Sequence, residues 1–493
     1  MVIAARSLKT FAAACGLTVL TNCAVVPSGS NSTPLDTAWP DSAPPPVEIK
    51  AAVVQEQLPQ DQYIQVYFNH NPAAEFTDPY RQIRRPGDDL EQVLVDSINQ
   101  ATRTVDVAVQ EIRLPKVAQA LVNRHKAGVQ VRVIVENSYR RPWTSYSEAD
   151  LAQMDARGRS RIQDYRRLGD RNRDGIISQE EADQTDTLYM LARAQVPVID
   201  DRADGSKGSG LMHHKFVVID GKQVVTGSAN FTPSDTFGDM GRPVTRGNPN
   251  HLIAINSPQV ARWFQAEFNQ MWGDGPGGST DSRFGKQKAF RPPYRITLGN
   301  TQLTVHFAPA PKAIAPADST IGTITKTLQN IQSRADLALF VFSEQRLTNA
   351  LLKSQRRGAQ IRALIDAGFA FRPYSEGLDM AGISRPNDKC EIELGNQPWT
   401  TPIADFGFPS LPEGDLLHHK FAVLDSNIVI TGSHNWSNAA ARNNDETLVV
   451  IENSAIAQHF QREFDRLIST ARLGIPKNVK SKINQQKQAC RRR

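Results

Sequence analysis

Cysteines and long hydrophobic runs are both scarce in this sequence of 493 residues. It has four cysteines, whose spacing matches no zinc site. No apolar run reaches the ~18 residues that a membrane-spanning helix needs, which excludes a polytopic membrane protein. Because 40% of the residues are hydrophobic, a disordered chain is excluded too. The length predicts two or three domains.

The excess of positive charge lies at the two ends of the chain. The whole sequence has 57 basic and 51 acidic residues, a net charge of +6. Residues 1–22 hold two bases and residues 472–493 hold eight, with no acid in either segment, so removing these ten bases leaves −4. The body is therefore mildly acidic. Residues 471–493 are predicted to form a basic C-terminal tail that contacts phosphates, lipid headgroups or anionic glycans, or is merely solvated.

Residues 1–22 have the pattern of an export signal. Arg6 and Lys9 precede the apolar stretch 10–20, which is too short to span a membrane. The following Leu-Thr-Asn-Cys run, ending at Cys23, resembles a bacterial lipobox, although Asn22 departs from that pattern. We therefore expect an exported protein of the cell envelope or periplasm that is lipid-anchored at Cys23. The alternative is an ordinary cleaved signal without an anchor.

The segment after this signal is predicted to be a linker. Residues 23–61 are rich in proline and serine, a composition that does not pack and that predicts a linker. In an oxidising compartment Cys390 and Cys490 could pair, although two cysteines alone do not establish a disulfide.

The remainder of the chain repeats itself. Residues 66–72 (VYFNHNP) resemble residues 305–311 (VHFAPAP), and each is followed by matching patterns in the same order. Gly128 and Gly358 are placed to end a helix in each half. The strand–helix–strand order predicts an α/β fold with two domains, 62–290 and 291–470. The matching segments are strands 105–109 and 337–341, helices 116–127 and 345–357, and strands 129–135 and 360–365.

Each half then carries the same pair of chemical motifs at the same spacing. The first half reads H-x-K from His213, with Asp220 five residues after the lysine, followed by G-S-x-N ending at Asn230. The second half repeats this from His418 to Asn435. Because positions i and i+2 of a strand share a face, His213 and Lys215 point together while His214 points away. The returning segment brings a hydroxyl and an amide to the same end.

This set of side chains suits a tetrahedral phosphate. One neutral imidazole can attack phosphorus and form a phosphohistidine, while the other donates a proton to the leaving alkoxide and later activates water. Two lysines and two asparagines can stabilise charge on the non-bridging oxygens. The pattern predicts catalysis without a cofactor.

The paired motifs resemble the signature of the phospholipase D superfamily, H-x-K-x4-D followed by G-S-x-N, twice per active site. The resemblance covers residues 62–469. It implies that two α/β/α repeats pack as a pseudo-two-fold pair around one shared active site. It further implies His213 as nucleophile, His418 as general acid, Lys215, Lys420, Asn230 and Asn435 as phosphate binders, Ser228 and Ser433 at the substrate, and Asp220 and Asp425 as mainly structural residues.

Members of this superfamily carry an acidic residue that orients the opposite histidine. Glu446 fills that position in the second half. Aligning residues 252–255 (LIAI) with residues 448–451 (LVVI) puts Asn250 there in the first half. A carboxylate facing one histidine and an amide facing the other would make the two unequal. This favours His213, oriented by Glu446, as the nucleophile, with the swapped assignment as the alternative.

An insertion lengthens the first half. The distance from Gly128 to His213 is 85 residues, against 60 from Gly358 to His418. The surplus contains residues 170–181, which match a twelve-residue EF-hand loop, with flanking helices expected over 148–168 and 179–193. A lone calcium site of this kind is expected to be structural; the alternative is an acidic loop that binds nothing. The expected calcium ligands are Asp170, Asn172, Asp174, the carbonyl of Ile176, Ser178 and Glu181.

The motifs specify the reaction and leave the substrate open. A lipid anchor would hold the site near a membrane, and an acidic body offers little counterion release to a polynucleotide. Hydrolysis of phosphatidyl phosphodiester bonds is therefore the favoured reading, with a phospholipid or membrane surface as partner. The alternative is an exported nuclease that holds DNA or RNA with its basic tail. A binding protein with weak catalysis is disfavoured by the intact motifs. Both motifs lie in one chain, so a monomer is expected to be functional.

Overall fold

The structure, a computed structural model, describes residues 55–206 and 208–492. The predicted signal, Cys23 and nearly all of the predicted linker lie outside these residues. None of the helices in the described ranges combines the length and the hydropathy needed to cross a bilayer.

The first half is built on a mixed seven-stranded sheet with the order β1-β9-β8-β7-β4-β5-β6. Strand β4 pairs parallel to β5 and antiparallel to β7. The strands are β1 (Ile64–Phe68), β4 (Thr104–Val109), β5 (Gln130–Val135), β6 (Val198–Asp200), β7 (Lys215–Ile219), β8 (Gln223–Gly227) and β9 (His251–Asn256), with a separate hairpin β2 (Glu75–Thr77) and β3 (Arg84–Pro86). The helices are α1 (Leu90–Asn99), α2 (Pro115–Lys126), α3 (Glu148–Gln153), α4 (Ala156–Gly169), α5 (Gln179–Thr185), α6 (Thr187–Arg193), α7 (Pro233–Thr236) and α8 (Pro258–Trp272).

The second half repeats this sheet and adds one strand at each edge. Its order is β10-β11-β19-β17-β16-β12-β14-β15-β20, so the seven central strands correspond one by one to those of the first half. The strands are β10 (Tyr294–Leu298), β11 (Thr301–Ala308), β12 (Arg334–Leu339), β14 (Gln360–Ile365), β15 (Phe406–Phe408), β16 (Lys420–Leu424), β17 (Ile428–Gly432), β19 (Glu446–Glu452) and β20 (Arg472–Leu473), with β13 (Phe342–Ser343) and β18 (Trp436–Ser437) in a small separate sheet. The helices are α9 (Thr320–Gln329), α10 (Gln345–Arg356), α11 (Glu376–Met380), α12 (Asn438–Arg442), α13 (Ser454–Ser469) and α14 (Lys477–Arg491).

The internal repeat and the α/β class predicted from the sequence are both present. Segments 105–109 and 337–341 overlap β4 and β12, and the predicted helices coincide with α2 and α10 to within two residues. Gly128 and Gly358 follow these helices with φ of 86° and 101°, a conformation that favours glycine at a helix end.

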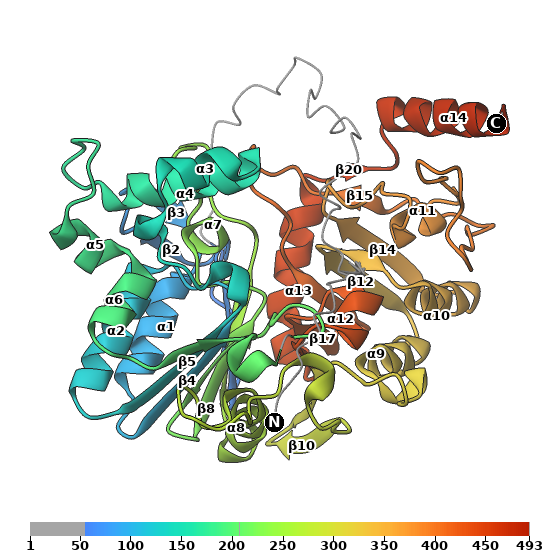
Figure 1. The fold of residues 1–493 in the computed structure, drawn as a ribbon. Coiled ribbons are helices and arrows are strands. Elements are labelled where there is room, and N and C mark those ends of the chain that lie inside the picture. Colours follow the sequence, from blue (N-terminus) through green and yellow to red (C-terminus); the bar gives the residue numbers. More distant parts are fainter. Residues whose placement is uncertain (1–54, 207, 493) are drawn as a thin grey trace, which may run out of the picture. The chain divides into compact units, whose positions relative to one another are not determined.

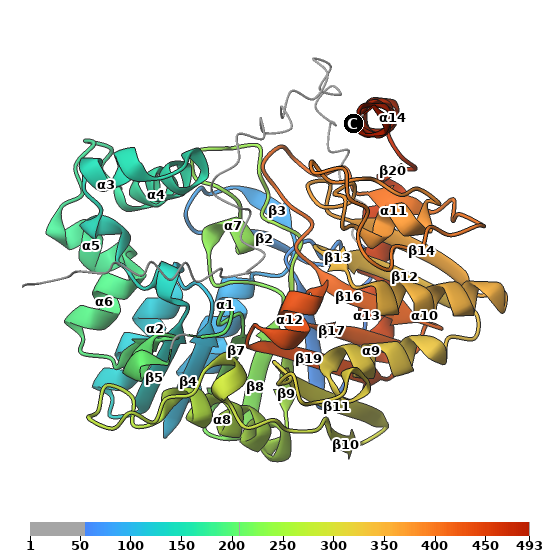
Figure 2. The same cartoon turned by 45° about the vertical axis from the view of Figure 1, so that its right-hand side comes forward.

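Alternate side chains of each sheet enter different hydrophobic layers. In β7, Phe216 and Val218 join a central core, whereas Val217 and Ile219 face an outer one. The central core also receives α8 and α13 and the facing side chains of the second sheet. Helices α1 and α2 cover the outer face of the first sheet, and α9 and α10 that of the second (Figures 1 and 2). The layers therefore run helix, sheet, helix, sheet, helix.

The two motif aspartates hold the start of a neighbouring strand. Asp220 has a φ of 51° and accepts hydrogen bonds from the main-chain N–H groups of residues 102 to 104, while Asp425 does the same for residues 332 to 334. Burial opposes ionisation of Asp220, but these hydrogen bonds outweigh it and lower its pKa to about 2. Both carboxylates therefore bind main-chain N–H groups, as expected of residues with a structural role.

The insertion in the first half forms a helix–loop–helix, with shorter helices than predicted. The expected helix 148–168 is two helices, α3 and α4, because Asp155 caps the start of α4. The expected helix 179–193 is likewise divided into α5 and α6, because Asp186 caps α6. Asparagine and aspartate caps compete with helix continuation, which periodicity alone does not reveal.

The predicted basic tail is an ordered helix, α14, and not a free segment. Ile483 is buried in the outer core of the second half, with Val479 packed beside it. A disulfide joins Cys490 of this helix to Cys390, across 100 residues of sequence. One apolar face and one covalent link therefore fix a segment whose charge alone suggested solvation.

Candidate functional site

Strands β7 and β16 position the two H-x-K motifs in the same way. Each strand begins at its lysine, so His213 and His418 lie just before the strand. The chain then returns along β8 or β17, each ending at a glycine. A Cβ on Gly227 or Gly432 would come within 2.2 Å of a carbonyl oxygen of the neighbouring strand, which is why the G-S-x-N motif needs glycine there.

Main-chain pairing joins the two halves at the first motif. Met212 forms a parallel bridge with Asp445, and the His213 N–H donates to the Asp445 carbonyl over 3.0 Å. This contact brings the His213 ring to the first residue of β19. The Nδ1 atom of His213 lies 2.8 Å from Oε2 of Glu446. A carboxylate of the second half thus fixes the imidazole of the first, in the orientation that frees Nε2.

The reciprocal contact uses an amide. The Nδ1 atom of His418 lies 3.0 Å from Oδ1 of Asn250. The strand register supports the alignment of Asn250 with Glu446, because Gly227 pairs with Leu252 and Gly432 pairs with Leu448. The two histidines therefore have different partners.

An acid near His418 could not be identified from the sequence. The Oδ2 atom of Asp235 lies 3.7 Å from Nδ1 of His418, and this side chain is 5% exposed. It accepts hydrogen bonds from the main-chain N–H of Asn230 and from the Nδ2 of Asn248. Asp235 stands five residues after Asn230 in the N-terminal turn of the short helix α7, outside every motif, so no pattern pointed to it.

Four groups that can carry positive charge share one buried place. Lys215 and Lys420 are 0% and 1% exposed, and their Nζ atoms donate to the carbonyls of His213 and His418. Burial lowers the pKa of Lys215 to about 8, and burial followed by the charge of Lys215 lowers the pKa of Lys420. Burial and then the two ammonium groups hold the pKa of both histidines well below the usual range. These mutual effects place both motifs in one electrostatic site.

The two motif asparagines have unsatisfied atoms at this site. The Oδ1 atoms of Asn230 and Asn435 are buried without a hydrogen-bond partner. Oxygen and nitrogen of a side-chain amide are exchanged by a half-turn, which would present an unpaired NH2 donor instead. An anion with several oxygens supplies the acceptor that such a donor needs.

The two motif serines, expected at the substrate, are occupied elsewhere. Ser433 is fully buried and its hydroxyl donates to Oε2 of Glu446 over 2.6 Å, while Ser228 donates to Oδ1 of Asn250 over 2.7 Å. Each oxygen also accepts a main-chain N–H. A hydroxyl whose proton is already donated cannot donate it to substrate as well, so these serines orient the partners of the histidines.

The other two histidines of the motifs point away, as the strand alternation predicted. His214 contacts Glu267 of α8 at 3.2 Å and Thr447 at 2.9 Å, and His419 contacts Glu463 of α13 at 2.8 Å. Both imidazoles are buried in the layer between the sheets.

Lys288, in the connection between the two halves, was also not identified from the sequence. Its Nζ lies 2.6 Å from Oδ1 of Asp445 and also contacts Glu267. One buried ammonium thus compensates two buried carboxylates, one from each half, directly beside the Met212–Asp445 bridge. A lysine in a glycine- and proline-rich connection carries no sequence signal of such a role.

Comparisons with known proteins bear on both halves. Residues 94–272 and 324–468 match a family model described as "Cardiolipin synthase, PLD-like domain". A mitochondrial cardiolipin hydrolase of Xenopus laevis is 29% identical over 152 residues, which are 30% of this chain and 61% of that protein. A phospholipase D of Rickettsia felis is 26% identical over 140 residues, 28% of this chain and 60% of that protein. The chain thus spans about three fifths of the length of these relatives.

Among solved structures, a phosphatidylserine synthase of Haemophilus influenzae aligns with a TM-score of 0.49 at 11% identity. The alignment covers 88% of this chain and 95% of that one.

The unequal partners of the histidines predict an effect of Asn250→Asp. This change puts a carboxylate 3.0 Å from Nδ1 of His418, with Ser228 in place to donate to it, and should raise the pKa of His418 by about 1 to 3. NMR titration of ¹³C-labelled histidine measures the change. Asn256→Asp, at the exposed end of β9, should leave the His418 titration in place. An unchanged His418 titration in Asn250→Asp would refute the contact.

Proposed function

This chain belongs to the phospholipase D superfamily, with two PLD-like domains, and from this premise we propose that it hydrolyses phosphatidyl phosphodiester bonds through a covalent phosphohistidine. One observation carries the proposal. Imidazoles from the two halves, each held at Nδ1 by the opposite half, share a buried site with two ammonium groups. Such a site offers a nucleophile, an acid and charge stabilisation to one tetrahedral anion.

His213 is the proposed nucleophile. Its low pKa leaves it neutral at physiological pH, so Nε2 carries a lone pair when Nδ1–H donates its hydrogen bond to Glu446. Attack of Nε2 on phosphorus forms the N–P bond as the P–O bond to the leaving alcohol breaks. The imidazole becomes cationic during this step, and the Glu446 carboxylate stabilises that charge.

His418 is the proposed general acid. It must be protonated to donate to the leaving alkoxide, yet burial and then the two lysines lower its pKa in the free protein. A phosphodiester anion between Lys215 and Lys420 offsets their charge, and the Asp235 carboxylate favours the imidazolium form. Proton uptake by His418 is therefore expected to accompany substrate binding. After the alcohol leaves, the neutral His418 takes a proton from water, which attacks phosphorus and releases His213.

The proposed stabilisers of the transition state are Lys215, Lys420, Asn230 and Asn435. The lysines carry charge where the non-bridging oxygens gain it, and each asparagine amide has a buried Oδ1 atom without a partner, so that a half-turn of the amide would offer an NH2 donor there. Because these groups are fixed and largely dry, they need little rearrangement as the charge develops.

A phospholipid is the proposed substrate, and a nucleic acid is the alternative. Relatives that match this chain at 28 to 29% identity carry the name mitochondrial cardiolipin hydrolase, and another is named phospholipase D. The mildly acidic body also disfavours a polynucleotide. The basic helix α14 is the feature that keeps a nuclease in consideration.

The choice of substrate predicts a direct result. Purified protein should release headgroup from phosphatidylcholine or cardiolipin and leave single-stranded DNA intact, because the proposed site serves a lipid phosphodiester. Headgroup release and gel electrophoresis measure the two reactions side by side. His213→Asn is the control and should abolish whichever reaction occurs. Cleavage of DNA alone would overturn the lipid assignment and leave the histidine mechanism standing.

The assignment of the two histidines predicts different single-turnover behaviour. A bis-nitrophenyl phosphodiester has a leaving group that needs no proton, so His418→Asn should still give a burst of nitrophenolate and then stall at the phosphohistidine. His213→Asn should give no burst. Rapid-quench kinetics with phosphohistidine detection under alkaline conditions measure both. The reverse pattern would assign the nucleophile to His418.

We also propose that residues 170–181 bind calcium. The loop lies between α4 and α5, and Gly175 at its sixth position has a φ of 82°, as the sharp turn requires. Hydrogen bonds from Ser178, Arg171 and Asn172 lower the pKa of Glu181 to about 2, so its carboxylate is ionised at neutral pH. Asp170 and Asp174 accept hydrogen bonds from main-chain N–H groups inside the loop. The donor set is oxygen throughout, which fits a hard cation; the bound ion would supply charge compensation to the loop.

Calcium should therefore stabilise the protein. At a concentration about a hundredfold above its Kd, it should add about 2.7 kcal/mol to the free energy of unfolding. Differential scanning calorimetry and isothermal titration measure the two quantities. Glu181→Gln should abolish the gain, whereas Glu180→Gln, at the exposed neighbouring position, should retain it. No binding at millimolar calcium would refute the site.

Export to the cell envelope or periplasm remains a proposal, as does a lipid anchor at Cys23. The Cys390–Cys490 disulfide supports an oxidising compartment. A functional monomer is proposed because both motifs of the site belong to one chain.

A further inference from the structure

We propose that helix α14 and the apolar pocket beside it form a docking site for an anionic lipid bilayer, separate from the histidine site. The inference rests on the proposed phospholipid activity for its context only, because docking is a binding event that does not require turnover. Four features of the described residues carry it: the charge of the helix, its attachment, the pocket and the exposed apolar residues around it.

The charge of α14 forms a stripe. Residues 472–492 contain seven basic and no acidic side chains. Lys477, Lys480, Lys487 and Arg491 follow each other at spacings of three, seven and four, which places them along one flank of the helix. No ion pair involves these side chains within the described residues. A row of unpaired ammonium and guanidinium groups attracts an anionic surface.

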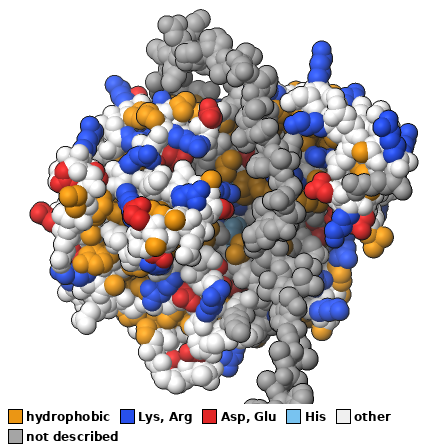
Figure 3. All heavy atoms as spheres, turned by 45° about the horizontal axis from the view of Figure 1, so that its top comes forward, with side chains coloured by type: hydrophobic (Ala, Val, Ile, Leu, Met, Phe, Trp, Pro, Cys, Tyr) orange, Lys and Arg blue, Asp and Glu red, His pale blue; other side chains and the backbone are white. Residues whose placement is uncertain are grey.

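The helix is fixed to the body on the flank that holds Ile483, and Lys477, Lys480 and Arg491 remain exposed while Lys487 is half-buried. Ile483 is buried, Val479 packs beside it, and Gln486 accepts a hydrogen bond from Arg385. The disulfide from Cys490 to Cys390 secures the far end. In Figure 3, Lys and Arg side chains project from the upper right part of the face, the side on which α14 lies in Figure 1.

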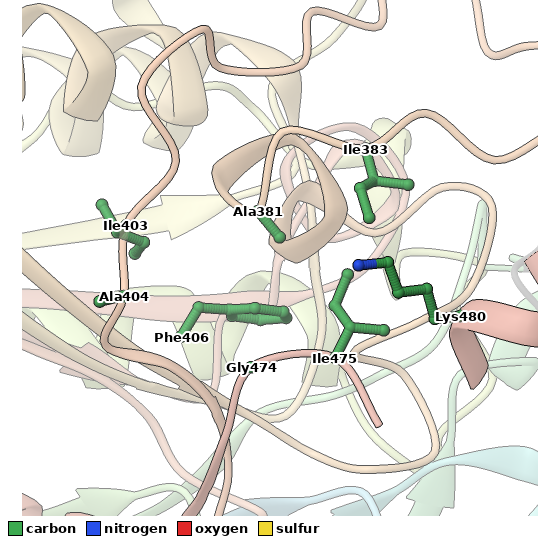
Figure 4. A pocket seen from close by; sticks show the side chains of 8 residues that line it. All are labelled: Ala381, Ile383, Ile403, Ala404, Phe406, Gly474, Ile475 and Lys480. Carbon is green, nitrogen blue, oxygen red and sulfur yellow. The ribbon is translucent and has the colours of Figure 1, made fainter. Parts of the chain in front are cut away.

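An apolar pocket of about 250 Å³ opens beside the start of α14. Its walls are mostly hydrophobic, and one ammonium group, that of Lys480, reaches in toward them (Figure 4). An apolar cavity with one cation suits an amphiphile that has a hydrocarbon part and an anionic headgroup. The walls are formed chiefly by Ile383, Ile403, Phe406 and Ile475.

Exposed large hydrophobic side chains gather in the same region of the chain. Leu394 is 100% exposed and Ile392 is 46% exposed, and both lie within four residues of Cys390, which is bonded to α14. Leu473, at 48%, lies four residues before the first residue of the helix. The loop with Leu394 also carries acids, but its residues 383–396 contribute a net charge of only −1 against the seven bases of the C-terminal segment.

This combination favours a bilayer over a nucleic acid. A polynucleotide would satisfy the basic stripe and leave the pocket and the exposed leucines in water. An anionic bilayer satisfies both, since headgroups meet the bases while acyl chains meet the apolar groups. Docking there would hold the protein at the surface that contains its proposed substrate.

The test is vesicle flotation of the full chain with phosphatidylglycerol–phosphatidylcholine vesicles and with pure phosphatidylcholine vesicles. We expect binding to the anionic vesicles only. Removing one ammonium should weaken binding about fivefold, so Lys477→Gln, Lys480→Gln and Lys487→Gln together should weaken it ~100-fold. Leu394→Ser with Ile392→Ser should weaken it as well, and at these exposed positions the fold is not at risk.

A matched control removes the same charge elsewhere. Lys126→Gln, Lys222→Gln and Lys353→Gln, all exposed and outside α14, should bind vesicles like the unaltered protein. Equal losses in the two triple variants, no loss in either, or displacement from vesicles by duplex DNA with tight DNA binding would overturn the proposal.

A soluble chromogenic phosphodiester separates this proposal from the catalytic one. All the docking variants should hydrolyse it at the unaltered rate. Vesicle binding without any diester cleavage would refute the proposed function and leave the docking site standing. Diester cleavage without vesicle binding would refute the docking site and leave the proposed function standing.

Discussion

The contact between His213 Nδ1 and Glu446 Oε2 crosses from one half of the chain to the other, and many of the buried polar groups serve to hold it. Ser433 donates to the same carboxylate, and the adjacent Asp445 pairs with Met212 through the main chain. Lys288 compensates the charge of Asp445. A buried carboxylate without such partners would neutralise itself by taking up a proton, and it would then lose its hold on the imidazole.

The same site collects more positive charge than a protein interior tolerates without compensation. Lys215 and Lys420 are both buried, the charge of Lys215 lowers the pKa of Lys420, and burial together with the two ammonium groups lowers the pKa of the histidines. A phosphodiester anion bound there, as proposed, would supply the missing counter-charge, and it would bind most strongly where negative charge accumulates. The free protein bears the electrostatic cost in advance, which is how a preorganised site favours its transition state over its ground state.

The sequence predicted the repeat, the order of strands and helices along each half, and the positions of Glu446 and Asn250 opposite the histidines, because each follows from local periodicity or from identical spacing. It failed where a role depends on contacts across the fold. Asp235 and Lys288 act through partners far away in sequence, and the hydroxyls of Ser228 and Ser433 turned out to point at Asn250 and Glu446. The packing of the C-terminal segment could not be predicted for a related reason. Its charge was visible, but the burial of Ile483 depends on the distant surface that it covers.

The difference between Asn250 and Glu446 has a consequence for how this molecule can be assembled. Two copies of the first half placed in the same arrangement would face each histidine with an amide, and two copies of the second would face each with an acid. Neither symmetric dimer would have one imidazole that faces a carboxylate and one that faces an amide. Covalent linkage of unlike halves therefore gives a duplicated architecture two histidines with different partners, and the two halves are no longer interchangeable.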